Sequence, residues 1–180
     1  TVSDMKKMKA VVEAGEPLAI YPAGLMCADG LSTPVPKATY KFLKWMNVDV
    51  YMARTEGSYF VMPKWSKKLR PGKTQMDITL LFTKEELGKL SLEEIQKRTD
   101  AVLLYDAYRD QEQHPYHYAG CEDIRGLEHV LYQCPHCGNE YTMQVTDKSV
   151  ITCSACGFSQ TMDKQGFFHC EDREKEIRHV

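Results

Sequence analysis

The sequence has 180 residues, of which 43% are hydrophobic and 27% are charged, and its formal net charge at pH 7 is −2. These values are typical of a globular protein with a buried core, and a net charge so close to zero argues against a generic nucleic-acid-binding protein. The sequence contains neither an apolar run of the roughly 20 residues that a membrane-spanning helix needs nor a signal-peptide pattern. We therefore expect a protein that is soluble or lies peripherally at a membrane.

The amino-terminal part of the chain predicts a helix, a strand and a long loop. Residues 3–15 are predicted to be helical, because their apolar side chains recur at helical spacing and Gly15 can take the left-handed conformation that ends a helix. A short buried strand is expected at residues 18–21, and Pro22 ends it because proline cannot donate to a ladder. The loop that follows, residues 22–30, is placed at the carboxyl end of this strand, where α/β sheets bind ligands. We therefore expect a binding site there.

The next stretches predict one more helix and two or three strands. A second helix is expected from residue 37 to about residue 46, and a strand is expected at residues 48–53. Residues 59–62 are interpreted as a continuation or a partner of that strand. A basic loop follows at residues 64–73, and residues 74–82 are predicted to form another strand.

Two capping boxes follow in succession, Thr83 with Glu86 and Ser91 with Glu94. The second one is predicted to open a helix that runs from residue 92 to about residue 108. Helices that alternate with so few strands indicate an α/β fold that contains part of a sheet.

Residues 111–130 are polar and are predicted to be a linker. Within them, His114, His117 and Cys121 have a spacing that metal ligands can have. Pro115 breaks the helical register, however, and no fourth ligand is evident. We interpret these three residues as parts of a solvated linker, because short matches of this kind often arise by chance.

The seven cysteines include two Cys-x-x-Cys pairs that are separated by 15 residues. An odd number of cysteines with two such pairs is typical of a metal site in a reducing compartment. We therefore expect a cytoplasmic protein, with the inner face of the membrane as the place of any peripheral contact. Each pair is followed by a glycine that permits a tight turn, and four thiolates complete the tetrahedral coordination of Zn²⁺. The sequence therefore predicts a small all-β zinc ribbon at residues 131–170 and a charged tail at residues 171–180. The predicted zinc ligands are Cys134, Cys137, Cys153 and Cys156.

Four protein thiolates leave no coordination position for water, so this metal is expected to have a structural role. The rival interpretation is a nucleic-acid contact. Residues 134–170 contain two lysines against three acidic residues, so the basic stripe that phosphate binding needs is missing and no nucleic-acid partner is expected. The other cysteines, Cys27, Cys121 and Cys170, are interpreted as ordinary small side chains.

Three motifs in the first part of the chain carry a family resemblance. Tyr-Pro-Ala-Gly-Leu-Met-Cys-Ala-Asp-Gly at residues 21–30 is followed by a lysine-rich helix, by Val-Asp-Val-Tyr-Met-Ala at residues 48–53 and by Arg-Pro-Gly-Lys at residues 70–73. Their order and spacing resemble the second half of the glycerolipid (lysophospholipid) acyltransferase domain, over about residues 3–108. The resemblance implies that residues 1–110 form a partial acyltransferase-like α/β sheet with helices.

The resemblance also implies an activity. Members of the family transfer a fatty acyl group from acyl carrier protein or coenzyme A to a hydroxyl of a lysolipid acceptor, and a His followed five positions later by Asp provides the general base. No His of this sequence has an Asp at that spacing. We therefore assign no catalytic residue to this chain. We expect the general base upstream of Thr1. We therefore interpret the chain as the carboxyl-terminal part of an acyltransferase, which is an enzyme when an upstream His-x-x-x-x-Asp segment completes it.

The substrate-binding loop differs from the family pattern. The family usually has Pro-Glu-Gly followed by Thr-Arg, whereas this chain has Ala23, Leu25 and Met26 at the varied positions. Loss of the arginine removes a contact to phosphate worth about 1.5–3 kcal/mol, so we expect an acceptor other than a simple glycerol phosphate. The residues to which the resemblance assigns substrate binding are Tyr21, Pro22, Ala23, Gly24, Leu25 and Met26.

The basic loop provides a second possible contact with lipid. Each Lys or Arg near an anionic membrane contributes about 1 kcal/mol to binding, although a merely solvated loop explains the same charges. The residues concerned are Lys64, Lys67, Lys68, Arg70 and Lys73.

Two other functional hypotheses stay open. The altered substrate loop favours a catalytically inactive lipid-binding or protein-interaction module that carries a structural zinc ribbon. A nucleic-acid-binding ribbon protein is a third hypothesis, which the small number of lysines in the ribbon disfavours.

Overall fold

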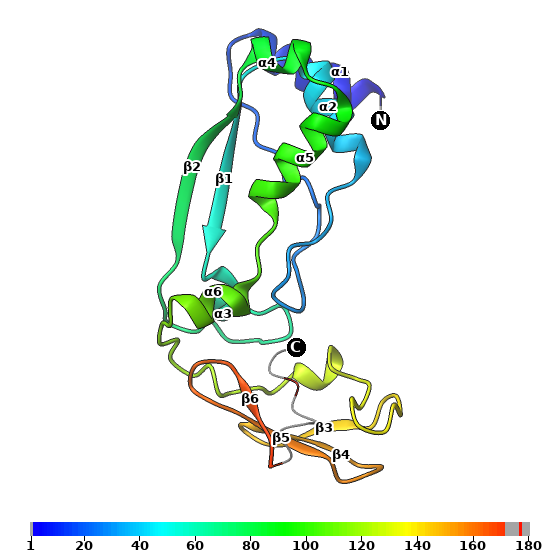
Figure 1. Cartoon of the computed structure of the whole chain (residues 1–180), viewed down its shortest axis with the longest axis vertical. Coiled ribbons are helices and arrows are strands. Elements are labelled where there is room, and N and C mark those ends of the chain that lie inside the picture. Colours follow the sequence, from blue (N-terminus) through cyan, green and yellow to red (C-terminus); the bar gives the residue numbers. More distant parts are fainter. Residues whose placement is uncertain (1, 172–176, 178–180) are drawn as a thin grey trace. The chain divides into compact units, whose positions relative to one another are not determined.

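The computed structural model describes residues 2–171 and residue 177 (Figure 1). Its helices and sheets give the α/β class that the sequence predicts, and the chain divides into two compact units. The first unit comprises Thr1–Met26, Thr33–Met52 and Ile78–Leu103, and the second comprises Cys27–Ser32, Ala53–Asp77 and Leu104–Val180. None of the helices in the described part is long and apolar enough to cross a lipid bilayer.

The described residues form helices, strands and one 3-10 helix, labelled in chain order in Figure 1. The helices are α1 (Val2–Glu13), α2 (Lys37–Met46), α3 (Ser58–Val61), α4 (Lys84–Lys89), α5 (Leu92–Leu103) and α6 (Ala107–Gln113), and the 3-10 helix is η1 (Leu127–His129). The strands are β1 (Val50–Glu56), β2 (Gln75–Phe82), β3 (Met143–Asp147), β4 (Val150–Cys153), β5 (Ser159–Met162) and β6 (Phe168–His169).

The core of the first unit forms around α2, which has the bounds that the sequence predicts. The buried face of α2 carries Tyr40, Leu43 and Met46, at spacings of three residues. The Tyr40 hydroxyl donates to Asp100 Oδ1 on α5 at 2.6 Å. The cluster that this face joins comprises Tyr40, Leu43, Leu81, Phe82, Leu87 and Ile95. Apolar periodicity therefore sets both the helix and its packing.

Both predicted capping boxes are confirmed. At the start of α4, Thr83 Oγ1 accepts from the Glu86 N–H at 3.2 Å, and the Thr83 N–H donates to the Glu86 carboxylate at 2.9 Å. At the start of α5, Ser91 and Glu94 make the same two bonds at 3.2 and 2.7 Å. Each box satisfies backbone N–H groups that have no partner within the helix.

The strand predicted at residues 18–21 is wrong. The structure assigns these residues to no strand, whereas the predicted strands at residues 48–53 and 74–82 form β1 and β2, which pair in a two-stranded sheet. A short apolar run becomes a strand only beside a free sheet edge, and Tyr21 is instead 90% exposed. The chain does turn at this point, because the Gly24 N–H donates to the Tyr21 carbonyl at 3.1 Å and Gly24 has a φ of +68°.

The interpretation of residues 59–62 as a strand is also wrong, because this segment contains α3. Tyr59 and Phe60 are both buried, and neighbouring residues of a strand point to opposite faces, so a helical turn is the conformation that buries both. The chain enters the turn through Gly57, which has a φ of +76° and donates its N–H to the Tyr105 hydroxyl at 3.1 Å. Aromatic packing thus overrides the strand pattern.

The helix predicted from residue 92 to about residue 108 is two helices. The chain leaves helical geometry after α5, because Tyr105 and Asp106 pair with the segment at residues 31–32. The Ser32 N–H donates to the Tyr105 carbonyl at 2.9 Å, and Leu31 forms a bridge with Asp106. Asp106 then caps α6 by accepting from the backbone N–H groups of Tyr108 and Arg109, both at 3.0 Å. This pairing depends on distant residues, which helical periodicity does not reveal.

The carboxyl-terminal part is an antiparallel four-stranded sheet in the order β3-β4-β5-β6. The small all-β part that the sequence predicts is confirmed, because its described strands, β3 to β6, pair with one another in this one sheet. Of the predicted charged tail at residues 171–180, residues 172–176 and 178–180 lie outside the described part.

The segment predicted to be a linker supplies buried side chains to the second unit. Ile124 and Leu127 are fully buried in a cluster with Trp65 and with residues of the four-stranded sheet. Tyr118 and Cys121 are buried in an aromatic cluster with Phe60. Most of these residues are separated by polar neighbours, so their burial follows from tertiary packing rather than from any local periodicity.

Candidate metal centre

The four cysteines of the two Cys-x-x-Cys pairs converge on one point. Their Sγ atoms all lie within 4.8 Å of one another. The Sγ atoms of Cys134 and Cys156 are 3.8 Å apart, and so are those of Cys137 and Cys153. Tetrahedral coordination with metal–sulfur bonds of about 2.3 Å places sulfur atoms about 3.8 Å apart, whereas a disulfide bond is about 2.05 Å long. The donor set therefore fits a tetrahedral metal ion and does not fit disulfides.

Two equivalent backbone turns position these thiols. In the first turn the Gly138 N–H donates to the Cys134 carbonyl at 2.9 Å, and in the second the Gly157 N–H donates to the Cys153 carbonyl at 2.9 Å. The two glycines have φ values of +73° and +75°. A side chain at either position would be strained, so the Cys-x-x-Cys-Gly sequence dictates this local geometry.

Burial and hydrogen bonding differ among the four ligands. Cys134 and Cys153 are 1% exposed and belong to the hydrophobic cluster beneath the sheet, whereas Cys137 and Cys156 are exposed. A hydrogen bond of 3.3 Å joins Cys153 Sγ to the Thr142 hydroxyl, and it lowers the pKa of the Cys153 thiol. The thiolate form of Cys153, which a metal requires, is thereby favoured, whereas burial raises the pKa of the Cys134 thiol.

The alternative set of His114, His117 and Cys121 is not brought together. Among the described residues, the four cysteines are the one group of three or more His, Cys, Asp or Glu side chains that are close enough to share a metal. His114 Nδ1 lies 3.0 Å from Asp110 Oδ1, one helical turn earlier on α6. Cys121 is 1% exposed, and burial raises the pKa of its thiol to about 11.

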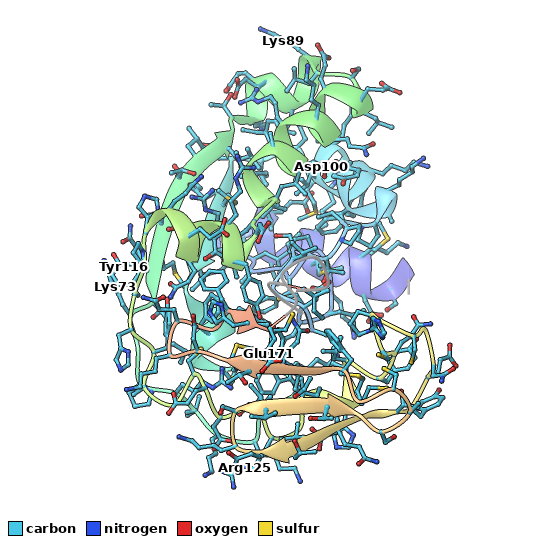
Figure 2. All side chains as sticks on the ribbon, turned by 60° about the horizontal axis from the view of Figure 1, so that its bottom comes forward. Lys73, Lys89, Asp100, Tyr116, Arg125 and Glu171 are labelled. Carbon is cyan, nitrogen blue, oxygen red and sulfur yellow. The ribbon has the colours of Figure 1, made fainter. Side chains whose placement is uncertain are left out.

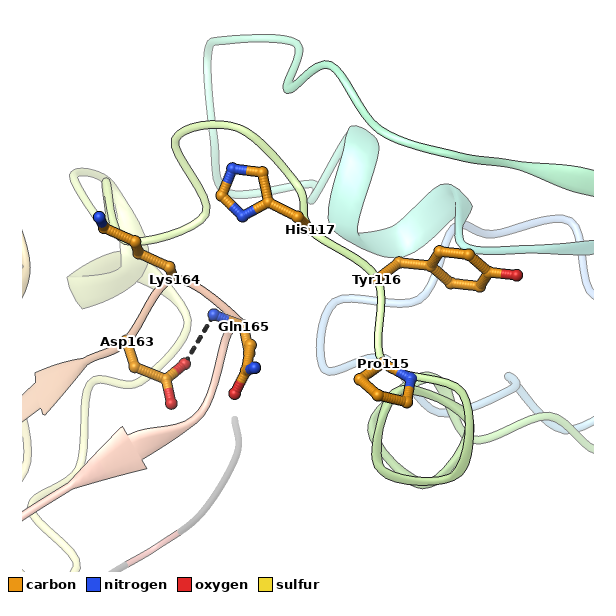
Figure 3. A pocket seen from close by; sticks show the side chains of 6 residues that line it. All are labelled: Pro115, Tyr116, His117, Asp163, Lys164 and Gln165. Atoms are coloured by element: carbon orange, nitrogen blue, oxygen red, sulfur yellow. Dashed lines mark hydrogen bonds between the residues drawn. The ribbon is translucent and has the colours of Figure 1, made fainter.

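His117 lines an open hollow of about 650 Å³ together with Asp163 and Gln165 (Figure 3). Asp163 Oδ1 accepts from the backbone N–H groups of Gln165 at 2.8 Å and Phe167 at 3.0 Å. Its other oxygen lies 2.6 Å from His169 Nε2. The carboxylate therefore organises its own loop, which accounts for its presence in the hollow.

A smaller cavity of about 230 Å³ was not predicted from the sequence. Its lining includes Lys73 and Tyr116, whose Nζ and hydroxyl atoms are 2.6 Å apart and which lie side by side in Figure 2. Asp110 and His114 are also part of the lining. The cavity joins segments that are distant in the sequence, and no single motif spans its lining, so no sequence signal identifies it.

The predicted substrate loop forms a turn on the surface of the first unit. Tyr21, Leu25 and Met26 are 90%, 71% and 55% exposed. Pro22 and Ala23 are half-buried and Gly24 is exposed. None of the six residues lines either of the two hollows described above. The structure thus exposes Tyr21, Gly24, Leu25 and Met26 and half-buries the other two residues.

The structure separates the members of the predicted basic surface. Lys64, Lys67, Lys68 and Lys73 are exposed. Arg70 is only 4% exposed, because its guanidinium lies 4.7 Å from the centre of the Trp65 ring and donates to the Asp123 carbonyl at 2.7 Å. Arg70 is therefore a structural residue in this fold, and its inclusion in the surface set is corrected.

Comparison with protein-family models, with curated proteins and with solved structures gave no match for this chain. The geometry of the four cysteines is therefore the strongest functional observation.

Proposed function

We propose that the carboxyl-terminal ribbon binds one Zn²⁺ ion as a structural centre, through Cys134, Cys137, Cys153 and Cys156. The observation that carries this proposal is the mutual spacing of the four Sγ atoms, all within 4.8 Å. Zinc is the ion of choice for four thiolates in tetrahedral geometry, because it has no preference for another geometry and bonds strongly to sulfur.

The proposed ion acts as a cross-link between two hairpins. It joins the turn before β3 to the turn after β4, while the buried cysteines extend the hydrophobic cluster that contains Ile151 and Phe168. A sheet of strands this short buries little apolar area, so the metal supplies much of its stability. Four protein ligands leave no position for water or substrate, which favours a structural over a catalytic role.

The test is the metal content of the purified chain. We expect one zinc ion per chain and, after exchange with Co²⁺, the absorption bands of tetrahedral cobalt thiolate. Cys156→Ser removes an exposed ligand and should abolish tight binding, whereas Cys170→Ser is the matched control and should keep the full metal content. Unchanged zinc content in the Cys156 variant would contradict the proposal.

We propose further that residues 3–108 are the carboxyl-terminal part of a lysophospholipid acyltransferase domain. The support is the ordered resemblance of residues 21–30, 48–53 and 70–73 to that family. A second support is the surface of the first unit. Large apolar side chains that are more than half exposed occur both in the substrate loop and on the strands, among them Leu25, Tyr51 and Ile78. Exposed apolar side chains in such numbers are typical of a surface that contacts another segment or a lipid.

In this proposal the chain contributes to substrate binding rather than proton transfer. A general-base imidazole on a His-x-x-x-x-Asp segment, which the present sequence lacks, takes the proton of the acceptor hydroxyl. The hydroxyl oxygen then attacks the thioester carbonyl of acyl carrier protein or coenzyme A, the carbon–sulfur bond breaks and the thiol leaves. The apolar side chains of Leu25 and Met26 suit contact with a fatty acyl chain.

The experiment is an acyl-transfer assay on the product of the complete reading frame that contains this chain. We expect transfer from acyl carrier protein or coenzyme A to a lysolipid, and Leu25→Asp should reduce it strongly, whereas Leu104→Asp is an equally exposed control outside the loop. A reading frame without His-x-x-x-x-Asp would end the enzymatic proposal. Lipid binding without turnover would favour the alternative, a catalytically inactive lipid-binding or protein-interaction module.

A further inference from the structure

Residues 64–69, which we name the lysine loop, are fixed at both ends by buried side chains. Trp65 near its start is 8% exposed and Arg70 directly after it is 4% exposed. The Arg70 guanidinium lies 4.7 Å from the centre of the Trp65 ring, so the two ends contact each other. The Arg70 N–H also donates to the Val61 carbonyl at 2.8 Å, which closes the loop at its base.

Hydrogen bonds and close packing also define the interior of the loop. The Ser66 N–H donates to the Pro63 carbonyl at 3.0 Å, and the Ser66 hydroxyl accepts from the Lys68 N–H and donates to the Lys68 carbonyl, both at 3.2 Å. At Gly126 a Cβ atom would lie 2.4 Å from the Trp65 carbonyl oxygen, so the backbone of a neighbouring segment rests directly on the loop. The loop is therefore preorganised, and a partner need not order it.

The exposed side chains of the loop include three lysines and one large apolar residue. Lys64, Lys67 and Lys68 are exposed, and Leu69 is 72% exposed. Arg125 and Lys68 approach the single carboxylate of Asp123, with 3.9 Å between Lys68 Nζ and Asp123 Oδ2. The lysines outnumber this carboxylate, so the lysine loop, which also exposes Leu69, keeps a net positive charge.

We propose that the lysine loop is a docking surface for an anionic phospholipid bilayer. Three ammonium groups meet the phosphate and carboxylate groups of the headgroups, and Leu69 enters the acyl boundary between them. Both the three lysines and Leu69 contribute to binding. Charge alone holds a protein at the headgroups, and one leucine alone binds too weakly. The proposal goes beyond acyl transfer and requires neither that activity nor the zinc ion.

The same surface fits single-stranded nucleic acid poorly. Such ligands bind where bases stack on exposed aromatic rings beside a basic groove. The aromatic ring of this loop, Trp65, is buried under Arg70, and the exposed apolar residue is a leucine. Arg70, which the sequence suggested as a lipid contact, instead packs on Trp65 and holds the end of the loop in place.

The experiment is flotation of the full chain with vesicles of equimolar phosphatidylserine and phosphatidylcholine, compared with vesicles of phosphatidylcholine alone. We expect binding to the anionic vesicles only. The triple variant Lys64→Gln, Lys67→Gln, Lys68→Gln should bind about a hundredfold more weakly and lose most of its salt dependence. Leu69→Ser should bind several-fold more weakly while its salt dependence is unchanged.

The matched control is the triple variant Lys84→Gln, Lys89→Gln, Lys97→Gln, which removes three exposed lysines of α4 and α5. It should bind the anionic vesicles as well as the unaltered chain does. Equal weakening by both triple variants would show that net charge alone drives binding and would overturn the proposal. Binding to single-stranded RNA without any flotation would also overturn it. Because no acyl donor is present, the result is independent of acyl transfer, and zinc content and circular dichroism verify that each variant folds.

Discussion

The ribbon and the first unit both have small hydrophobic cores, but different interactions stabilise them. The ribbon combines a cluster around Ile151 and Phe168 with four converging thiols. The first unit has no such cross-link among its described residues, and it depends on helix faces that meet around Leu87 and Ile95. It also leaves large apolar side chains such as Ile78 exposed, at 66%.

This difference shows which interactions each region needs for a stable fold. A metal ion can replace apolar area as a source of stability in a small domain, and the four thiols of the ribbon lie close enough to hold one. Helix packing needs apolar area to be covered, whereas large apolar side chains of the first unit such as Leu25 and Ile78 stay exposed. The following predictions test this contrast, beginning with the largest effect.

Removal of the metal should affect the ribbon alone. Structural zinc contributes on the order of 10–16 kcal/mol of apparent binding free energy to folding, so a strong chelator should unfold the ribbon sheet. Amide hydrogen exchange measures this for each region. We expect protection to disappear in β4 and to persist in α5. Retained protection in β4 without metal would show that the ribbon core is sufficient by itself.

Leu87→Ala should destabilise the first unit by about 2–5 kcal/mol, because it removes a fully buried side chain and leaves a cavity. Chemical denaturation followed by circular dichroism measures the loss, and bound zinc should stay unchanged. Leu25→Ala is the matched control, because Leu25 is 71% exposed and its replacement should change stability by less than about 0.5 kcal/mol. A loss of zinc in the Leu87 variant would contradict the independence of the two regions.

Gly126→Ala should destabilise the second unit more than Gly120→Ala does, by about 1–3 kcal/mol. Both glycines have positive φ values, +102° and +79°, so the backbone strain is similar. At Gly126 the added Cβ would also meet the Trp65 carbonyl oxygen at 2.4 Å, whereas nothing lies within 4 Å at Gly120. Thermal unfolding of the two variants measures the difference. Equal losses would show that residues 124–127 can move away from Trp65.

Thr83→Ala has the smallest expected effect, a loss of about 1 kcal/mol in the first unit. It removes the hydroxyl that accepts from the Glu86 N–H at the start of α4. Thr83→Ser keeps this hydroxyl and should be close to neutral. Denaturant midpoints of the two variants provide the comparison, and an equal loss in both would assign the effect to packing of the methyl group rather than to the cap.

Local patterns in the sequence predicted the features that depend on interactions between residues close together in the chain. The α2 helix, the two capping boxes and the Cys-x-x-Cys-Gly turns depend on residues within a few positions of one another. The convergence of these four cysteines could therefore be predicted residue by residue. The small polar cavity beside Lys73 could not, since the residues around it come from distant segments and share no pattern.

Only the tertiary structure decided the conformations that depend on distant neighbours. Residues 18–21 have the composition of a strand but lack a strand beside them, whereas Tyr59 and Phe60 became helical because both rings are buried. Arg70 carries the charge of a surface residue and is nevertheless buried against Trp65. Turns, caps and metal ligands involve short-range geometry that residue types specify directly. Strand pairing and side-chain burial are set by which distant segments meet, and that information is absent from any short stretch of sequence.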